Sequence, residues 1–130
     1  MNCRSKYHSK KVTIDGITFD SKKEAKRYQE LKLLERAGVI SGLELQRRFE
    51  LIPAQHETYA RYGKKGQRLK DGSRCLEKAV FYAADFCYKD KNGDLVVEDV
   101  KGYKSGGAYA VFSIKRKLMR YTYGISVKEV

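Results

Sequence analysis

The pattern of apolar and polar residues predicts a small hairpin and a long helix in the first third of the chain. Residues 12–19 (VTIDGITF) alternate on either side of Asp-Gly, the strongest short-range signal for a β-hairpin. Ser21 and Glu24 have the spacing of a capping box, good helix formers follow, and Gly38 provides a stop signal. We therefore expect a hairpin followed by a helix over 21–37.

Three strands, a second helix and a last short strand are predicted downstream. Apolar residues of one parity in 43–51 indicate a strand, and apolar runs in 80–88 and 95–101 flank the turn sequence KDKNGD, which predicts a second hairpin. Helical periodicity returns over 108–121, and the tail 125–130 alternates like a strand. The second helix carries an apolar stripe at spacings of 3, 4 and 3, made of Val111, Ile114, Leu118 and Tyr121.

The order of these elements predicts an α/β fold of the mixed α+β kind, with one αβββαβ core after the hairpin. A chain of 130 residues is short for two domains, so we expect a single domain over 1–130. Residues 1–11 form a basic N-terminal arm. Residues 54–78 combine three glycines and seven cations with no sustained period, which predicts a basic loop outside the core.

Composition points to a polyanionic partner. The chain has 28 Lys and Arg against 16 Asp and Glu, a net charge of +12, and a pI near 9.6. Such an excess is typical of proteins that bind nucleic acid. The longest apolar runs have five residues, far below the roughly 20 of a membrane span. The charged start of the chain does not resemble a signal peptide, and three cysteines without metal or redox spacing favour the reducing cytoplasm.

An acidic island interrupts this basic chain between Asp85 and Asp99. In VVEDVKG, Asp99 and Lys101 share one face of the predicted strand, while Glu98 points the other way and is expected to be solvated or salt-bridged. The preceding strand carries Asp85 among apolar residues, where a charge requires compensation.

The turn between these strands decides whether the two aspartates meet. A two-residue Asn-Gly turn pairs Asp85 with Val100 and places the aspartates on opposite faces. A three-residue loop of Lys91, Asn92 and Gly93 places Asp85 opposite Asp99. The second register needs a cation between the like charges, and a divalent metal meets that need. Mg²⁺ prefers one or two carboxylates with water and phosphate oxygens, and a nearby lysine can act on the water of phosphodiester hydrolysis.

The residues in these elements resemble the PD-(D/E)XK nuclease superfamily. Asp85, Asp99-Val100-Lys101 and Glu24 stand in the expected elements and order, although Ala84 occupies the position of the proline in the motif's name. The segments FDSKKEAKRYQELKLLERAGVI, ADFCY and VVEDVKG resemble more closely a small phage-encoded branch of that superfamily. Its members are regarded as endonucleases, some of them Holliday junction resolvases acting in DNA recombination.

This resemblance implies a restriction-endonuclease-like core and a role for each matching residue. Asp85, Asp99 and the backbone carbonyl of Val100 would hold Mg²⁺, for which Mn²⁺ could substitute. Lys101 would activate or position the attacking water, and Glu24 would hold the metal or its water. In a phage-encoded protein, the compartment would be the host cytoplasm.

Structural interpretations compete with these roles. Glu24 also fits the third position of the capping box with Ser21, and the two roles are compatible. Asp99 and Lys101 could be a surface pair on one strand. Candidate phosphate contacts come from the basic loop and from the second helix, where they could equally be solvated charges: Lys64, Lys65, Arg68, Lys70, Lys115 and Lys117.

Two functions follow, a Mg²⁺-dependent DNA endonuclease and a non-catalytic basic nucleic-acid-binding module. The three residues Asp85, Asp99 and Lys101 favour the enzyme, because a module that only binds phosphates gains nothing from acids in its groove. A chain without room for a recognition domain favours structure-selective cutting of branched DNA. Symmetric cutting of a junction needs two active sites, and hence a homodimer.

Overall fold

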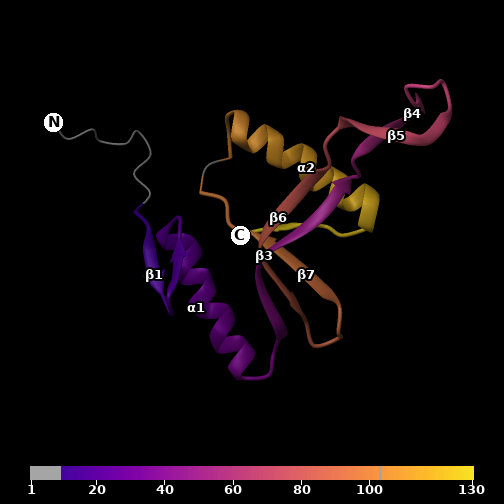
Figure 1. The fold of residues 1–130 in the computed structure, drawn as a ribbon. Helices are drawn as coiled ribbons and strands as arrows, with labels where there is room; N and C mark the ends of the chain where they lie inside the picture. The colour runs from indigo at the N-terminus through magenta and orange to yellow at the C-terminus, as the bar shows by residue number, and fades with distance from the viewer. Residues whose placement is uncertain (1–9, 103) are drawn as a thin grey trace.

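The computed structural model describes residues 10–102 and 104–130, and it has the predicted mixed α+β architecture (Figure 1). In chain order the elements are β1 (Val12–Ile14), β2 (Ile17–Phe19), α1 (Lys22–Arg36), β3 (Ser41–Ile52), β4 (Gln55–Tyr62), β5 (Arg68–Glu77), β6 (Val80–Lys89), β7 (Leu95–Asp99), α2 (Gly107–Tyr123) and β8 (Lys128–Glu129). Without β4 and β5, this is the expected hairpin followed by αβββαβ. The predicted N-terminal arm lies outside the described residues except for Lys10 and Lys11.

A four-stranded mixed sheet in the order β3-β6-β7-β8 forms the centre of the fold. β3, β6 and β7 are antiparallel, and β8 returns parallel to β7. Neighbouring residues of a strand point to opposite faces, and the core divides accordingly. Phe86 and Tyr88 join a cluster with α1 and the N-terminal hairpin, whereas Cys87 and Val97 join a second cluster with α2. Neither helix is long and apolar enough to cross a membrane in the part of the chain described.

Local signals in the sequence account for the first elements. Asp15 and Gly16 both have positive φ, 53° and 77°, as a two-residue hairpin turn of type I′ requires. Ser21 Oγ accepts a hydrogen bond from the backbone N–H of Glu24 at 3.1 Å, so the serine half of the capping box is formed. Gly38 ends α1 with a φ of 75°. These expectations are confirmed.

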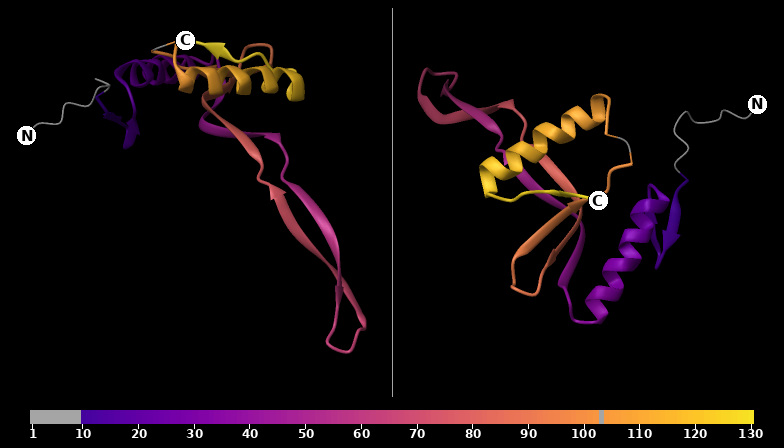
Figure 2. Two further views of the ribbon diagram at one scale, coloured as in Figure 1. Left: turned by 90° about the horizontal axis from the view of Figure 1, so that it is seen from above. Right: turned by 180° about the vertical axis from the view of Figure 1, so that it is seen from behind.

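The prediction of a loop over 54–78 was wrong. β4 and β5 form a two-stranded antiparallel ribbon, residues 55–77, that projects from the body of the molecule (Figure 2). No residue of this ribbon is buried. The alternating apolar pattern that marks a strand arises from burial of one face, so strands without a buried face lack that signal.

Most of the apolar stripe on α2 is exposed, and of its four members Leu118 packs against the core. Val111 and Ile114 are 54% and 59% exposed, and Tyr121 is 89% exposed. The helix also packs through Phe112 and Met119, which lie one position along from two members of the stripe. With apolar residues on several sides of this helix, periodicity alone could not identify the buried face.

Glu98 is buried rather than solvated, and it joins α1 to the sheet. It has no exposed surface, and its carboxylate accepts hydrogen bonds from Arg27 Nε and Nη2 at 2.7 and 2.8 Å and from the Tyr88 hydroxyl. Burial alone would raise the pKa of Glu98, but the bonds from Arg27 and Tyr88 outweigh it and hold that pKa below its usual value. The carboxylate is therefore charged at neutral pH.

Removing the Glu98 carboxylate should lower the free energy of unfolding far more than removing the exposed Glu30 carboxylate. We expect Glu98→Ala to lower the free energy of unfolding by about 3–5 kcal/mol, because Arg27 and Tyr88 lose their buried acceptor. Glu30→Ala removes an exposed partner of the same Arg27 and should cost at most about 1 kcal/mol. Urea denaturation measures both. Equal losses for the two variants would contradict a dominant role of the buried pair.

Candidate active site

The turn between β6 and β7 has the three-residue form. Lys89 pairs with Leu95, and the Asp90 N–H donates to the Asp94 carbonyl at 3.0 Å, which closes the ladder around residues 91–93. Gly93 takes the required positive φ of 81°. At the other end Phe86 pairs with Glu98, so the next residue along each strand places Asp85 opposite Asp99. The register that brings the two aspartates to one face is confirmed.

The strands β3 and β6 both change face at the position of Asp85. Leu45 packs in the α1 cluster and Phe49 in the α2 cluster, although a regular strand would keep both on one face. The change occurs at Gln46, which has a φ of 53° and stands opposite Asp85. On β6, Ala84 and Phe86 likewise belong to different clusters. Asp85 therefore lies where the sheet is locally irregular.

Asp85 is held by donors from two neighbouring strands. Its Oδ2 accepts from the Val100 N–H at 2.9 Å, and its Oδ1 accepts from Gln46 Nε2 at 3.1 Å. Burial, then the charge of Asp99, raises the pKa of Asp85 to about 6, despite these two donors. The two carboxyl groups are thus close enough for each to feel the other's charge.

Asp99 is buried beside one cation and one hydroxyl. It is 6% exposed; its Oδ2 accepts from the Tyr82 hydroxyl at 2.6 Å, and its Oδ1 lies 2.9 Å from Lys101 Nζ. Burial and the bond to Asp99 raise the pKa of Tyr82, which keeps its hydroxyl a donor. Lys101 Nζ also lies 3.6 Å from the centre of the Phe112 ring. This arrangement differs from a surface pair, because both charged groups are largely removed from water.

Glu24 contributes a third carboxyl group from α1. Its backbone N–H is capped by Ser21, while burial, followed by the charges of Asp85, Asp20 and Asp99, raises the pKa of its side chain to about 7. The backbone of Glu24 thus takes part in the cap of α1, while its carboxyl group lies near the two aspartates. Among the described residues, however, no group of three acidic, His or Cys side chains is close enough to hold one metal ion, so Glu24 is not brought into a closed set of ligands.

The chemistry of the remaining donors fits a magnesium ion. Two carboxylates on one face and a neighbouring backbone carbonyl are oxygen ligands of the kind that Mg²⁺ takes, and this ion keeps several waters rather than demanding a full protein shell. Asp85 and Asp99 supply the carboxylates, and Val100, the residue after Asp99, supplies the carbonyl. Burial and then the charge of Asp99 raise the pKa of Asp85, and a bound cation would offset the second of these causes.

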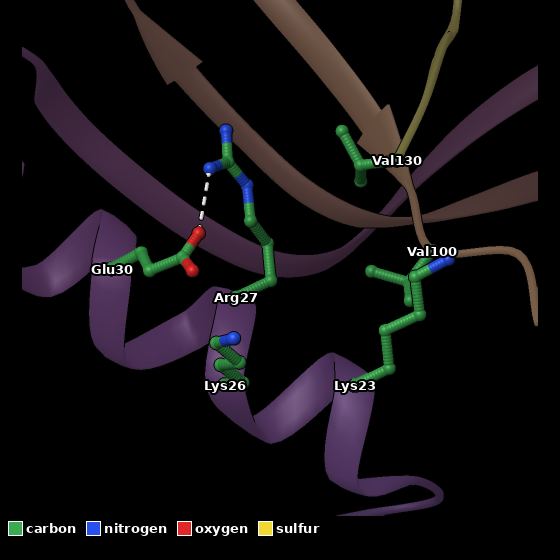
Figure 3. A pocket seen from close by; sticks show the side chains of 6 residues that line it. All are labelled: Lys23, Lys26, Arg27, Glu30, Val100 and Val130. Atoms are coloured by element: carbon green, nitrogen blue, oxygen red, sulfur yellow. Dashed lines mark hydrogen bonds and ion pairs between the residues drawn. The ribbon is translucent and has the colours of Figure 1, made fainter.

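A pocket of about 250 Å³ opens beside this site, between α1 and the end of β7 (Figure 3). Lys23 closes one side by donating from Nζ to the Lys101 carbonyl at 2.7 Å. Arg27 is already bound to Glu98 and Glu30. The pocket lining thus serves mainly to fix α1 against the strand that carries Asp99.

The predicted nucleic-acid contacts lie on two separate elements, the ribbon and α2. Lys64 and Lys65 lie in the turn of the ribbon, and Arg68 and Lys70 lie on β5. Lys115 is half-buried and Lys117 exposed on α2. Contacts that the sequence did not indicate are made by Tyr82, Gln46 and Phe112, which carry no motif; their positions depend on the strand irregularity and on helix packing.

Comparison with known proteins gives a family without an activity. A family model described as a protein of unknown function, DUF1064, matches residues 4–129. Neither the curated proteins nor the solved structures contain a match.

The charge of Asp85 destabilises the folded protein, so replacing this residue with the neutral Asn is predicted to raise stability by an amount that depends on pH. When folding raises the pKa of a carboxyl group, that group lowers the free energy of unfolding. For Asp85 this loss grows as pH rises from its ordinary pKa of 3.8 to the folded value of about 6. Without divalent cations, Asp85→Asn should therefore be more stable than the unsubstituted protein by about 1–2 kcal/mol at pH 7. The advantage should shrink toward pH 4.

Chemical denaturation in EDTA at pH 4, 5, 6 and 7 measures this difference. Asp94→Asn, in the exposed turn of the same hairpin, provides the matched control and should show no such dependence. An advantage of Asp85→Asn that is the same at every pH would argue against charge as its cause.

Proposed function

The chain belongs to the DUF1064 family of proteins of unknown function, and we propose that it is a Mg²⁺-dependent DNA endonuclease. The observation that carries this proposal is the convergence of Asp85 and Asp99 on one face with Lys101 beside them. Two carboxylates and a lysine, in a chain with a net charge of +12, suit hydrolysis of a phosphodiester in a polyanion.

In this proposal Asp85, Asp99 and the Val100 carbonyl hold the ion. When bound there, Mg²⁺ supplies the positive charge that polarises the phosphate and makes water a better nucleophile. Gln46 and Tyr82 keep the two aspartates in place through the hydrogen bonds described above. They act on the ligands and are positioning residues.

Lys101 stabilises charge at the phosphate under attack. Lys101 Nζ lies near both the Asp99 carboxylate and the face of Phe112, which attract a positive charge. An ammonium can orient the attacking water and neutralise the negative charge that develops on the phosphoryl oxygens. Glu24 is suited to accept a proton from water, because its pKa of about 7 matches neutral pH.

We further propose branched DNA as the substrate and a homodimer as the active form for symmetric junction cutting. The resemblance of segments such as VVEDVKG to a branch that includes Holliday junction resolvases supports recognition of DNA shape over a long specific sequence. Two active sites would be needed to cut two strands at once.

The alternative is a basic module that binds nucleic acid without cutting it. The observation that favours this reading is the ion pair of Asp99 with Lys101, which together with Tyr82 gives both carboxylate oxygens a partner. In that case, the aspartates would be structural, and the exposed basic ribbon would be the functional surface.

Cleavage assays separate the two. Asp99→Asn should lower the rate of Mg²⁺-dependent cleavage of branched DNA by about a hundredfold or more, since the amide is a poor ligand for a hard cation. DNA affinity should stay within about twofold, because the change removes a negative charge. Lys101→Ala should also stop turnover, with some loss of affinity. Asp94→Asn should cut normally. Absence of cleavage by the unsubstituted protein on junctions, flaps, nicks and duplex would favour the binding module.

Metal binding can be measured without activity. We expect Mg²⁺ or Mn²⁺ at millimolar concentration to raise the melting temperature of the unsubstituted protein, because an ion bound only by the folded state stabilises it. Asp85→Asn and Asp99→Asn should lose this rise, whereas Asp94→Asn should keep it. Equal shifts in all four proteins would indicate a general salt effect and no specific site.

A further inference from the structure

The ribbon of β4 and β5 is exposed on both faces, which is unusual for a hairpin that keeps its form. A two-stranded hairpin alone is marginal in water. Here side chains clamp the two strands: Arg74 pairs with Glu57 at 2.8 Å and stacks 4.7 Å above the ring of Tyr59. Tyr59 in turn covers Gly72, where an added Cβ would lie 2.3 Å from the ring. These contacts between the strands give the ribbon a defined conformation although neither of its faces is buried.

Positive charge gathers in the half of the ribbon that lies farthest from the body. Residues 60–71 hold five cations against one acid, whereas the rest of the ribbon has one cation and two acids. The single acid of the far half, Asp71, is paired with Arg68. In the described part of the chain, no ion pair involves the other four cations, namely Arg61, Lys64, Lys65 and Lys70.

The turn presents its lysines on an ordered backbone. The Gly63 N–H donates to the Gln67 carbonyl at 2.8 Å, the Gly66 N–H donates to the Gly63 carbonyl at 2.9 Å, and the Lys65 N–H donates to Gln67 Oε1 at 3.1 Å. Both Lys64 and Lys65 are exposed. Two exposed lysines on an ordered turn at the end of a narrow arm are suited to reach into a groove.

We propose that the far half of the ribbon lies in the major groove of a duplex DNA arm, away from the cleavage point. This inference rests on DNA being the ligand in the proposed function. The major groove of B-DNA, about 12 Å wide, admits a two-stranded ribbon. The deep and narrow major groove of A-form RNA does not admit side chains in this way. A second copy of the chain is disfavoured as occupant, because two such arms would repel each other.

The length of the arm gives the expected spacing. β5 continues into β6 through Lys78 and Ala79, so Lys70 lies 15 positions before Asp85 on nearly extended chain (Figure 2). At about 3.3 Å per residue, Lys70 lies at most about 50 Å from Asp85, and Lys65, which is 20 positions before Asp85, lies at most about 65 Å from it, while the ribbon alone spans about 30 Å. With a rise of about 3.4 Å per base pair, contact falls about 10–20 base pairs from the cut.

The test compares two double variants on two arm lengths. Forked DNA carries a hairpin-closed duplex arm of 8 or 20 base pairs, and binding is measured with proteins that also carry Asp99→Asn. We expect Lys64→Ala/Lys65→Ala to weaken binding to the long arm about tenfold and to reduce the slope of log K against log salt by up to about 1.8, that is, about 0.9 for each phosphate contact. Binding to the short arm should not change.

Lys89→Ala/Lys91→Ala is the matched control, because it removes the same charge from exposed lysines at the β6–β7 turn. It should bind both arms like its parent. Equal weakening on long and short arms, or equal effects of the two double variants, would overturn the proposal, as would the same arm-length effect on duplex RNA. Arg68 is left unchanged because it holds Asp71 and stacks on Tyr62.

Cleavage by the same lysine variants without Asp99→Asn separates this inference from the nuclease proposal. If the lysine variants still cleave short-armed DNA and bind the long arm as tightly as their parent, the ribbon proposal alone would be wrong. Arm-dependent binding without any Mg²⁺-dependent cleavage would support the ribbon and remove the nuclease. A shortened protein, with residues 55–77 replaced by Asn-Gly, should fold and lose the preference for long arms, because no deleted residue is buried.

Discussion

The ion pair between the half-buried Arg27 and the fully buried carboxylate of Glu98 is the interaction on which the placement of the candidate site depends. It fixes α1 against β7, and α1 carries Glu24 toward the aspartates. A fully buried carboxylate tolerates only a narrow range of partner positions, because displacement of the guanidinium would leave a charge without compensation. The helix is thus held in a fixed position against β7, in which Asp99 directly follows Glu98.

The two consecutive acids of β7 are stabilised in the same way on opposite faces. Each has one cation and one tyrosine hydroxyl: Glu98 has Arg27 and Tyr88, and Asp99 has Lys101 and Tyr82. Both tyrosines come from β6. The difference lies in their neighbours, because Asp99 also faces Asp85, whereas Glu98 is enclosed by its partners. One strand therefore combines a structural carboxylate with one that has an unfavourable like charge beside it.

Much of this architecture could be predicted from the sequence where the signal is local. The Asp-Gly turn, the Ser21 cap and the Gly38 stop each depend on a few adjacent residues, and all are formed. The meeting of Asp85 with Asp99 depended on a choice between two common turns that only the structure resolves. The positive φ of Gln46 and the buried side of α2 could not be predicted, because both result from packing between segments distant in the chain. The ribbon escaped prediction because it has no buried face.

Because the ribbon has no buried residue, the consecutive strands β5 and β6 differ in local stability. β5 runs into β6, yet β6 lies in the centre of the sheet with Phe86 fully buried, whereas every ribbon residue contacts solvent. Backbone amides of the ribbon can therefore open without global unfolding, and those of central β6 exchange their hydrogens only when the sheet itself opens. Local unfolding or proteolytic cleavage of the ribbon would therefore not spread beyond Val80. The strand that carries Asp85 would stay folded.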